Sequence, residues 1–148
     1  MKKGKLLGCL VSARGIEANL EKIAVIINMK PPTTTKQVQK LTGRLPTLNR
    51  FIARSAEKGL PFFRILQNTK HFEWGSEQQQ AFEDLKTYLT KLTTLSKPSS
   101  SATFLLYLAA SPTTISTVLV KEKEHENRMK QFPVYFVSEA LSGTKLNY

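Results

Sequence analysis

The stretch Leu105-Leu-Tyr-Leu-Ala-Ala-Ser-Pro-Thr-Thr-Ile-Ser-Thr-Val-Leu119 decides the fold class of the second half of the chain. Two apolar runs flank a turn of small residues, which is typical of neighbouring antiparallel strands. Together with a third run, the pattern predicts strands at Thr103–Leu108, Ile115–Val120 and Pro133–Ser138. Loops between strands often carry catalytic residues. The stretch has no charge, so it is either a plain hairpin or a catalytic site without its acid.

Two polar segments accompany these strands: one joins the second strand to the third, and the other precedes the first. Lys121–Gln131 mixes glutamates with lysines and an arginine, and we interpret it as a solvated hairpin tip rather than a cation site. Thr93–Ala102 is rich in Ser and Thr, which is typical of a linker or an exposed loop. The sequence therefore predicts two units, residues 1–95 and residues 102–148.

The first unit is predicted to begin with a short hairpin and then become helical. Gly15 lies at the turn between two short apolar runs, and Asn19 has the side chain of a helix cap. The first helix should end before Pro31 and Pro32. The expected fold class is α+β, with a small helical segment between the hairpin and a partial antiparallel sheet of three strands.

A second helix is predicted from Thr34 through Ile52, with a kink at Pro46. Thr34 and Gln37 have the spacing of a capping box. Apolar residues recur every three or four positions along one face: Val38, Leu41, Leu45, Leu48 and Ile52. The opposite face is basic and consists of Lys36, Lys40, Arg44, Arg50 and Arg54.

Two further helices are expected before the linker. Leu60–Leu66 predicts a short one, and Ser76 with Gln79 predicts a second capping box. The buried face of the helix that follows is expected to contain Ala81, Phe82, Leu85, Leu89 and Leu92. Trp74 could stack on a base, but an aromatic residue at a helix junction more often belongs to the core.

The net charge of +11 is concentrated in one part of the chain. Residues 31–70 contain eight Lys or Arg and one Glu, and no acid occurs between Thr33 and Ala56. Solvated helix surfaces usually mix both signs. A one-sided basic face instead suits the phosphate backbone of a nucleic acid, although a merely solvated surface is the alternative.

Composition argues against several classes of function. One cysteine and two distant histidines give no metal-ligand spacing, and one aspartate with ten scattered glutamates does not obviously supply a two-metal site. We therefore expect no metal site and no cofactor. No apolar run is long enough for a membrane span. The sequence predicts an intracellular chain, in the cytoplasm or nucleus, that does not contact a membrane.

Several strings, taken together, resemble the pol polyprotein of Ty3/gypsy-type retrotransposons. In chain order they are Leu7–Ser12, Gly15-Ile16, Lys22–Pro32, Leu41–Gly43, Leu48–Ile52, Phe72–Trp74, Gln80–Lys86, Leu106-Tyr107, Ser111, Val118-Leu119, Pro133–Tyr135 and Ser138–Leu141. Because their order and spacing extend over nearly the whole chain, the match does not depend on one short motif.

The resemblance implies a domain layout and the loss of a catalytic aspartate. Residues 1–95 would be the end of the reverse transcriptase palm plus the helical thumb or connection region, and 102–148 the first three strands of a truncated RNase H-like domain. Active relatives use magnesium and carry an aspartate in a Leu-Tyr-x-Asp-Ala-Ser pattern, where this chain has Ala109. Pro112 and Ser116 also depart from the family here. The Tyr-x-Asp-Asp palm would lie before residue 1, and the remaining acids after Tyr148.

The expected function is therefore nucleic-acid binding without catalysis. The partner would be the backbone of an RNA–DNA or DNA duplex, bound independently of base sequence, together with the rest of a pol polyprotein. The isolated chain is not expected to be an enzyme. Three alternatives remain: a protein-interaction module that uses an exposed sheet edge or apolar face, a pseudogene-like remnant without function, and an active RNA–DNA hybrid nuclease segment.

Overall fold

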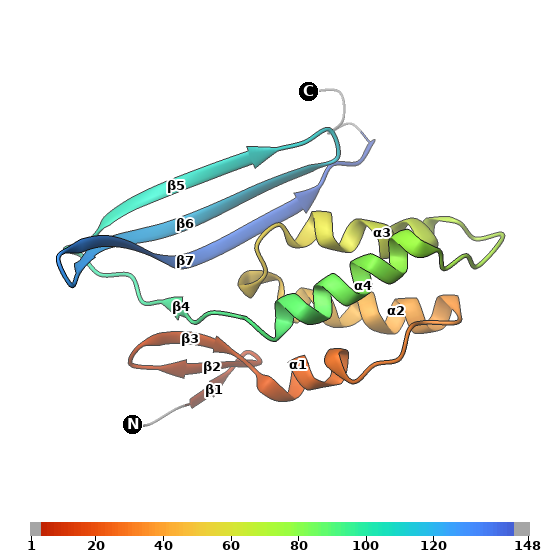
Figure 1. Cartoon of the computed structure of the whole chain (residues 1–148), viewed down its shortest axis with the longest axis horizontal. Coiled ribbons are helices and arrows are strands. Elements are labelled where there is room, and N and C mark those ends of the chain that lie inside the picture. The colour runs from red at the N-terminus through yellow and green to blue at the C-terminus, as the bar shows by residue number, and fades with distance from the viewer. Residues whose placement is uncertain (1–3, 144–148) are drawn as a thin grey trace.

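Two antiparallel sheets with helices between them form the described part of the chain, residues 4–143, in the computed structural model (Figure 1). The elements are β1 (Gly4–Leu6), β2 (Cys9–Ser12), β3 (Gly15–Ala18), α1 (Leu20–Ile27), α2 (Thr35–Arg44), the 3-10 turns η1 (Leu45–Thr47) and η2 (Asn49–Phe51), α3 (Ser55–Gln67), α4 (Ser76–Leu89), β4 (Leu95–Ser96), β5 (Thr103–Ala110), β6 (Thr114–His125) and β7 (Arg128–Ala140). The predicted α+β fold class is confirmed.

The N-terminal hairpin is part of a four-stranded sheet with the order β1-β2-β3-β4. Gly15 has a φ of +142° and pairs with Ser96, and a Cβ at Gly15 would lie 1.9 Å from the Leu95 carbonyl oxygen. Only glycine allows this close approach. The predicted linker Thr93–Ala102 therefore contains β4, a strand that the sequence did not reveal.

Helix α2 is shorter than predicted. It begins after Thr34, whose Oγ1 accepts a hydrogen bond from the Gln37 backbone N–H at 3.3 Å, and ends at Arg44. Pro46 has no N–H for an α-helical bond, so the chain continues as two 3-10 turns. The prediction of one kinked helix through Ile52 is wrong. The Gln37 side chain also departs from the capping box, because it accepts from Thr33 N–H at 2.7 Å.

Helix α4 begins one residue away from its predicted cap. Gly75 is the capping residue, and its N–H donates to Gln78 Oε1 at 3.0 Å. Gln79 instead accepts from Trp74 Nε1 at 2.9 Å. The Trp74 ring stacks on Phe62 with 5.9 Å between centroids and meets Phe82 edge-on at 5.8 Å. Its assignment to the core is confirmed.

The core lies between the helices and the N-terminal sheet. Phe82, Leu85 and Leu89 of α4 are buried as predicted, whereas Ala81 and Leu92 are half-buried at its margin. Helix α3 runs beyond the predicted Leu60–Leu66 and adds Phe62 and Ile65 to this core. Within residues 4–143, no helix is both long and apolar enough to cross a membrane.

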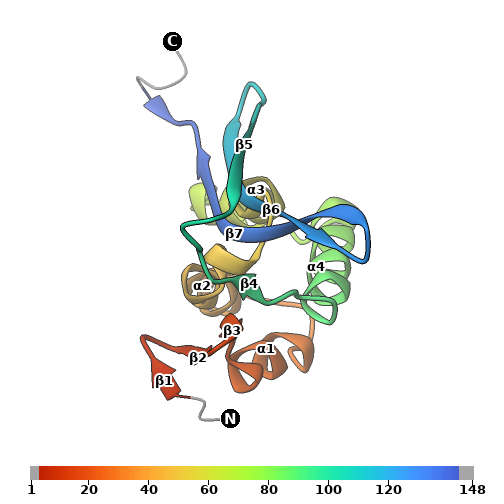
Figure 2. The same ribbon diagram turned by 90° about the vertical axis from the view of Figure 1, so that its left-hand side faces the viewer.

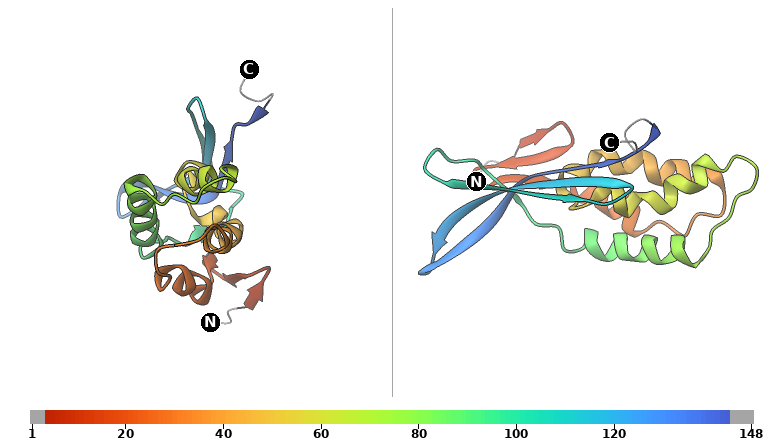
Figure 3. Two further views of the ribbon diagram at one scale, coloured as in Figure 1. Left: turned by 90° about the vertical axis from the view of Figure 1, so that its right-hand side faces the viewer. Right: turned by 90° about the horizontal axis from the view of Figure 1, so that it is seen from above.

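The C-terminal sheet is the predicted antiparallel meander β5-β6-β7, with longer strands than expected. The segment Lys121–Gln131 continues β6 and β7 into a long hairpin, whose turn lies at Glu126 and Asn127 with φ values of 52° and 59°. Such paired positive φ values are typical of a type I′ turn. The sheet rises from the helical layer (Figure 2 and Figure 3), with β7 next to α3 and β5 farther away (Figure 1).

Candidate nucleic-acid interface

Three of the five predicted binding residues lie on one face of α2. Lys36, Lys40 and Arg44 follow each other at intervals of four residues, which places them on neighbouring turns of the same side. Lys36 and Lys40 are exposed and Arg44 is half-buried. None of the three forms an ion pair with an acid within residues 4–143.

The basic face of α2 borders a hollow of about 270 Å³ lined by Met29, Lys30, Gln37, Lys40 and Arg44. Three of these five side chains are cationic and none is acidic. Arg44 Nη1 donates to the Lys40 carbonyl oxygen at 3.3 Å, which keeps its guanidinium close to Lys40. The arrangement offers several charged donors to one anionic group, and charge-assisted hydrogen bonds of this kind are among the strong ones.

Lys30 is the residue that sequence reasoning missed. It follows α1 and precedes Pro31 and Pro32, so nothing in the local pattern links it to α2. The chain folds back through the two prolines and brings Lys30 to the same hollow as Lys40 and Arg44. Nearby, Lys86 Nζ donates to the Met29 carbonyl oxygen and lies 4.4 Å from the Phe82 ring centroid.

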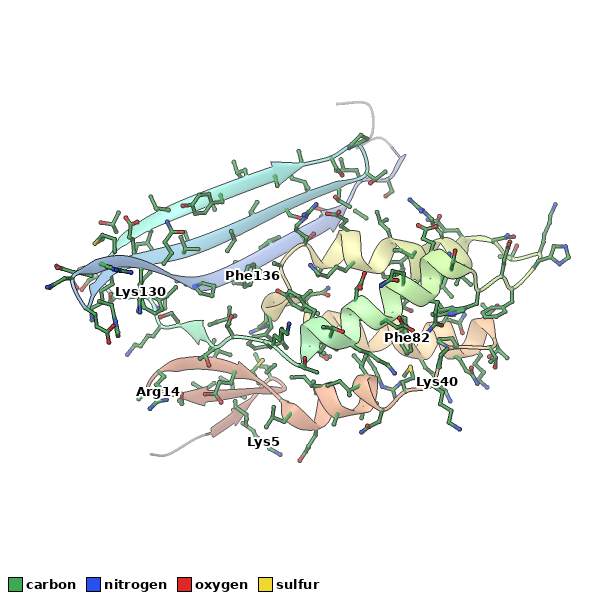
Figure 4. The ribbon with its side chains drawn as sticks, in the orientation of Figure 1. Lys5, Arg14, Lys40, Phe82, Lys130 and Phe136 are labelled. Atoms are coloured by element: carbon green, nitrogen blue, oxygen red, sulfur yellow. The ribbon has the colours of Figure 1, made fainter. Side chains whose placement is uncertain are left out.

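Arg50 and Arg54 do not belong to this face. Arg50 lies in η2, and Arg54 precedes α3 with a positive φ of 55°. Arg54 Nη2 contacts Glu57 Oε2 at 2.6 Å, so its charge has a partner. The predicted single basic face of five residues is therefore wrong as geometry, because the helix that should carry it ends at Arg44. Figure 4 shows Lys40 beside α2, at the far end of the molecule from Lys130 of the β6–β7 hairpin.

Ala109 lies in β5, directly opposite Ser116 of β6. It borders a second hollow, of about 190 Å³, together with Arg54, Tyr107, Val118 and Phe136. The two serines on this side of the sheet are already engaged. Ser116 Oγ lies 2.8 Å from Ser138 Oγ, and Ser138 Oγ accepts from the Ala56 backbone N–H at 3.1 Å.

Comparison with known proteins places the chain in a family. Residues 74–148 match the family described as the RNase H-like domain found in reverse transcriptase. The chain belongs to this family. Its relatives include the Transposon Tf2-3 and Tf2-4 polyproteins of Schizosaccharomyces pombe, each 26% identical over 144 residues, which is 97% of this chain and 11% of the polyprotein. The resemblance to retrotransposon polyproteins is confirmed, and this RNase H-like chain spans about a tenth of their length.

Solved structures share the fold of the RNase H-like chain. The foamy viral protease-reverse transcriptase in complex with RNA/DNA hybrid matches with a TM-score of 0.75 and 20% identity, over 97% of this chain and 19% of that one. The same protein in complex with dsDNA matches with a TM-score of 0.75 and 20% identity, over 100% and 30%. At this level of identity the likeness shows the fold alone.

The residues around Ala109 do not fit the magnesium that the family resemblance implies. Magnesium prefers carboxylate oxygens, whereas the hollow beside Ala109 is lined by a guanidinium and no carboxylate. Within residues 4–143 of this RNase H-like chain, no group of three or more His, Cys, Asp or Glu residues is arranged to hold a metal ion. The hollow at α2 is lined by three cationic side chains and no acid, so it suits an anion rather than a metal ion.

Proposed function

We propose that this RNase H-like chain binds the phosphate backbone of a nucleic-acid duplex and does not cleave it. The observation that carries the proposal is the hollow at α2, where Lys30, Lys40 and Arg44 converge without an acidic neighbour. Lys36 extends the same face by one helical turn. Contacts of this kind neutralise phosphates and carry little base information, so we expect affinity for duplexes of any sequence.

The comparisons support the choice of a duplex. Two of the matching structures, both of the foamy viral protease-reverse transcriptase, are complexes with an RNA/DNA hybrid and with dsDNA, and they share this fold over nearly the whole chain. The Tf2 relatives are polyproteins, which supports a second partner, the remainder of such a polyprotein. Arg50 and Arg54 stay in the proposal as secondary contacts on separate elements, with Arg54 weakened by its ion pair to Glu57.

The test is the dependence of duplex affinity on salt. For B-DNA the log–log slope falls by about 0.9 per neutralised phosphate. We therefore expect Lys40→Ala/Arg44→Ala to lower the affinity and to reduce the steepness of the slope by about two. Lys30→Ala alone should reduce it by about one, although the sequence pattern gave this residue no role.

A matched control distinguishes binding at the α2 hollow from a general effect of the positive charge of the chain. Lys123→Ala/Lys130→Ala removes the same two charges from paired positions on the β6–β7 hairpin. We expect this variant to keep the wild-type slope. An unchanged slope in Lys40→Ala/Arg44→Ala, or an equal loss in the control, would refute binding at α2.

The proposed lack of cleavage has its own test. We expect no magnesium-dependent cleavage of an RNA–DNA hybrid by the wild type, and none by Ala109→Asp. A carboxylate at position 109 would border the hollow that Arg54 also lines, and two-metal chemistry needs several converging carboxylates. Hybrid cleavage measured with and without chelator decides the matter, because chelator-sensitive activity in either protein contradicts the proposal.

A further inference from the structure

The α2 hollow offers hydrogen-bond donors to a ligand. Lys30, Lys40 and Arg44 contribute cations from two segments, the connection after α1 and helix α2 itself (Figure 1). The Lys40 carbonyl oxygen accepts from Arg44 Nη1 at 3.3 Å, and the Met29 carbonyl oxygen accepts from Lys86 Nζ. Lys86 thereby holds a fourth cation beside the lining of the hollow. The lining therefore suits a ligand with several acceptor atoms and more than one negative charge.

Gln37 adds a neutral donor to these cations. Its Oε1 accepts from the Thr33 backbone N–H at 2.7 Å and from Thr33 Oγ1 at 3.1 Å. A backbone N–H can only donate, so the amide atom that faces it is the oxygen and not the nitrogen. This contact fixes the orientation of the amide and leaves Nε2 to donate to a ligand in the hollow, which Gln37 lines.

The phosphates of a nucleic acid differ in what they offer to such a hollow. An internal phosphodiester carries one negative charge, has two oxygens outside its ester bonds, and is joined to the strand on both sides. A phosphate monoester at a strand end carries about −1.5 to −2 charges at pH 7 and has three such oxygens. It is joined to the strand on one side only, so it can enter a recess. Three cations around one hollow match the charge of the monoester better than that of a single diester, which would leave more of their mutual repulsion uncompensated.

We propose that the α2 hollow binds a phosphate monoester at the end of a nucleic-acid strand in preference to an internal phosphate. This inference rests on the proposed duplex binding, and it specifies which phosphate of the duplex the hollow holds. Lys36, one turn before Lys40 on the same face, is left for an internal phosphate of the same strand. A phosphorylated end is therefore the preferred binding position on a duplex of any sequence.

The test compares short duplexes of one sequence whose ends carry a 5′-phosphate, a 3′-phosphate or only hydroxyl groups. Fluorescence anisotropy at low salt should show that at least one phosphorylated duplex binds about tenfold more tightly than the hydroxyl-ended duplex, the effect of one added charge-assisted hydrogen bond. Equal affinities of all three would overturn the inference. Duplex binding at α2 is tested separately, by the salt dependence of the hydroxyl-ended duplex with Lys40→Ala/Arg44→Ala, so failure of one proposal can be told from failure of the other.

The charge of the phosphate provides a second measurement. A phosphate monoester takes up a proton as the pH falls below about 6, whereas an internal phosphodiester keeps its single charge. The preference for a phosphorylated end should therefore shrink between neutral pH and about pH 5. The hollow is faced by Lys30, Lys40, Arg44 and, from α4, Lys86, and neither a histidine nor an acid lines it. A preference that does not change with pH would contradict recognition of the doubly charged monoester.

Gln37→Glu tests the hollow with a change that preserves shape. The carboxylate keeps an acceptor for Thr33 but replaces the Nε2 donor by a negatively charged oxygen, so the preference for a phosphorylated end should be lost. Gln39→Glu makes the same change at an exposed position of α2 that does not line the hollow, and should keep the preference. Thermal unfolding of both variants checks that the fold survives. A preference that survives in Gln37→Glu, or that is lost equally in both variants, would overturn the inference.

Competition distinguishes a strand end from a free phosphate. A nucleoside monophosphate carries the same monoester without a neighbouring backbone phosphate. It should be at least about tenfold weaker as a competitor than the unlabelled phosphorylated duplex, because it lacks the second contact. If it competes as well as the duplex, the hollow holds a free phosphate, and recognition of a strand end is refuted.

Discussion

At the scale of single residues, Lys58 and Tyr88 hold the backbone where the 3-10 turns give way to α3. Lys58 Nζ donates to the Ala53 carbonyl oxygen, and Tyr88 Oη accepts from the Ala53 N–H at 3.0 Å. The ammonium also lies 4.6 Å from the Tyr88 ring centroid, within the range of a cation–π contact. These contacts fix the residue just before Arg54, whose positive φ is uncommon for a side chain of its size.

The position of Lys58 predicts a dependence of stability on pH. Burial lowers the pKa of Lys58 below its ordinary value of 10.5, and the nearby Arg54 guanidinium lowers it further, while Glu57 partly opposes them. Between the lowered pKa and 10.5 the unfolded chain binds more protons than the folded chain. The Lys58 contribution to the free energy of unfolding should therefore rise as the pH increases through this window.

Urea unfolding of the wild type and of Lys58→Met, followed from neutral pH to about 10.5, measures this contribution. The difference in free energy should shift in favour of the wild type as the pH rises, because the variant has no amine to deprotonate. Lys123→Met, at an exposed position of β6, serves as the control and should show no such shift. A pH-independent difference for Lys58→Met would be inconsistent with a lowered pKa.

At the scale of elements, β4 depends on one glycine in β3. Gly15→Ala should place its methyl group against the Leu95 carbonyl oxygen and force an alanine to a φ of +142°. We expect a loss of about 3 kcal/mol in the free energy of unfolding, from backbone strain and from displacement of β4. Chemical denaturation measures it directly.

Gly43→Ala is the matched control for this element. Gly43 lies in α2 with an ordinary φ, and apart from the local helix backbone no atom of the described residues lies within 4 Å of the place that an added methyl group would take. An alanine is favoured over glycine in a helix interior, so this variant should be more stable by roughly 0.5–1 kcal/mol. If Gly15→Ala were as mild as Gly43→Ala, the close packing of β4 on β3 would be wrong.

The elements also show what a sequence can predict. The three C-terminal strands were visible because alternation and turn residues are local signals, and Asn19 was identified as a cap for the same reason. Strand β4 has only two residues, too few for any periodicity. The sequence predicts the end of α2 incorrectly because apolar spacing continues through residues 45–51, where Leu45, Leu48 and Phe51 are buried although the segment is not α-helical. The apolar spacing in this segment reflects packing against the core and not the period of an α-helix.

The candidate site was predictable only in part, for a related reason. Lys36, Lys40 and Arg44 share one helix, so their spacing was enough to place them together. Arg50 and Arg54 are not on this face because α2 ends at Arg44. Lys30 reaches the hollow through a tertiary fold-back, which has no signature in the local sequence.

At the scale of the whole molecule, β7 connects the C-terminal sheet to the rest. It packs against α3, η2 and β4, and its Phe136 lies between the sheet and the helices (Figure 4). The boundary predicted at 95–102 from composition therefore separates two segments that share a packed contact. Such a contact should make them unfold together rather than as independent units.

Phe136→Ala tests this coupling. The side chain is half-buried against the main core, so its removal should lower the free energy of unfolding by about 2 kcal/mol. Trp74 is the one tryptophan of the chain and belongs to the helical core, stacked on Phe62. Phe136 belongs to the sheet. A shift of the Trp74 fluorescence transition toward lower denaturant would therefore show that a substitution in the sheet also destabilises the helical core.

A second probe and a control variant distinguish coupled unfolding from independent unfolding of the two segments. Far-ultraviolet circular dichroism, to which sheet and helices both contribute, should give the same midpoint as Trp74 fluorescence in the wild type and in Phe136→Ala. Met129→Ala removes a side chain that is 60% exposed on the same strand, and should leave both midpoints in place. If Phe136→Ala splits the two transitions and leaves the Trp74 midpoint unchanged, the C-terminal sheet unfolds by itself and β7 is only a surface contact.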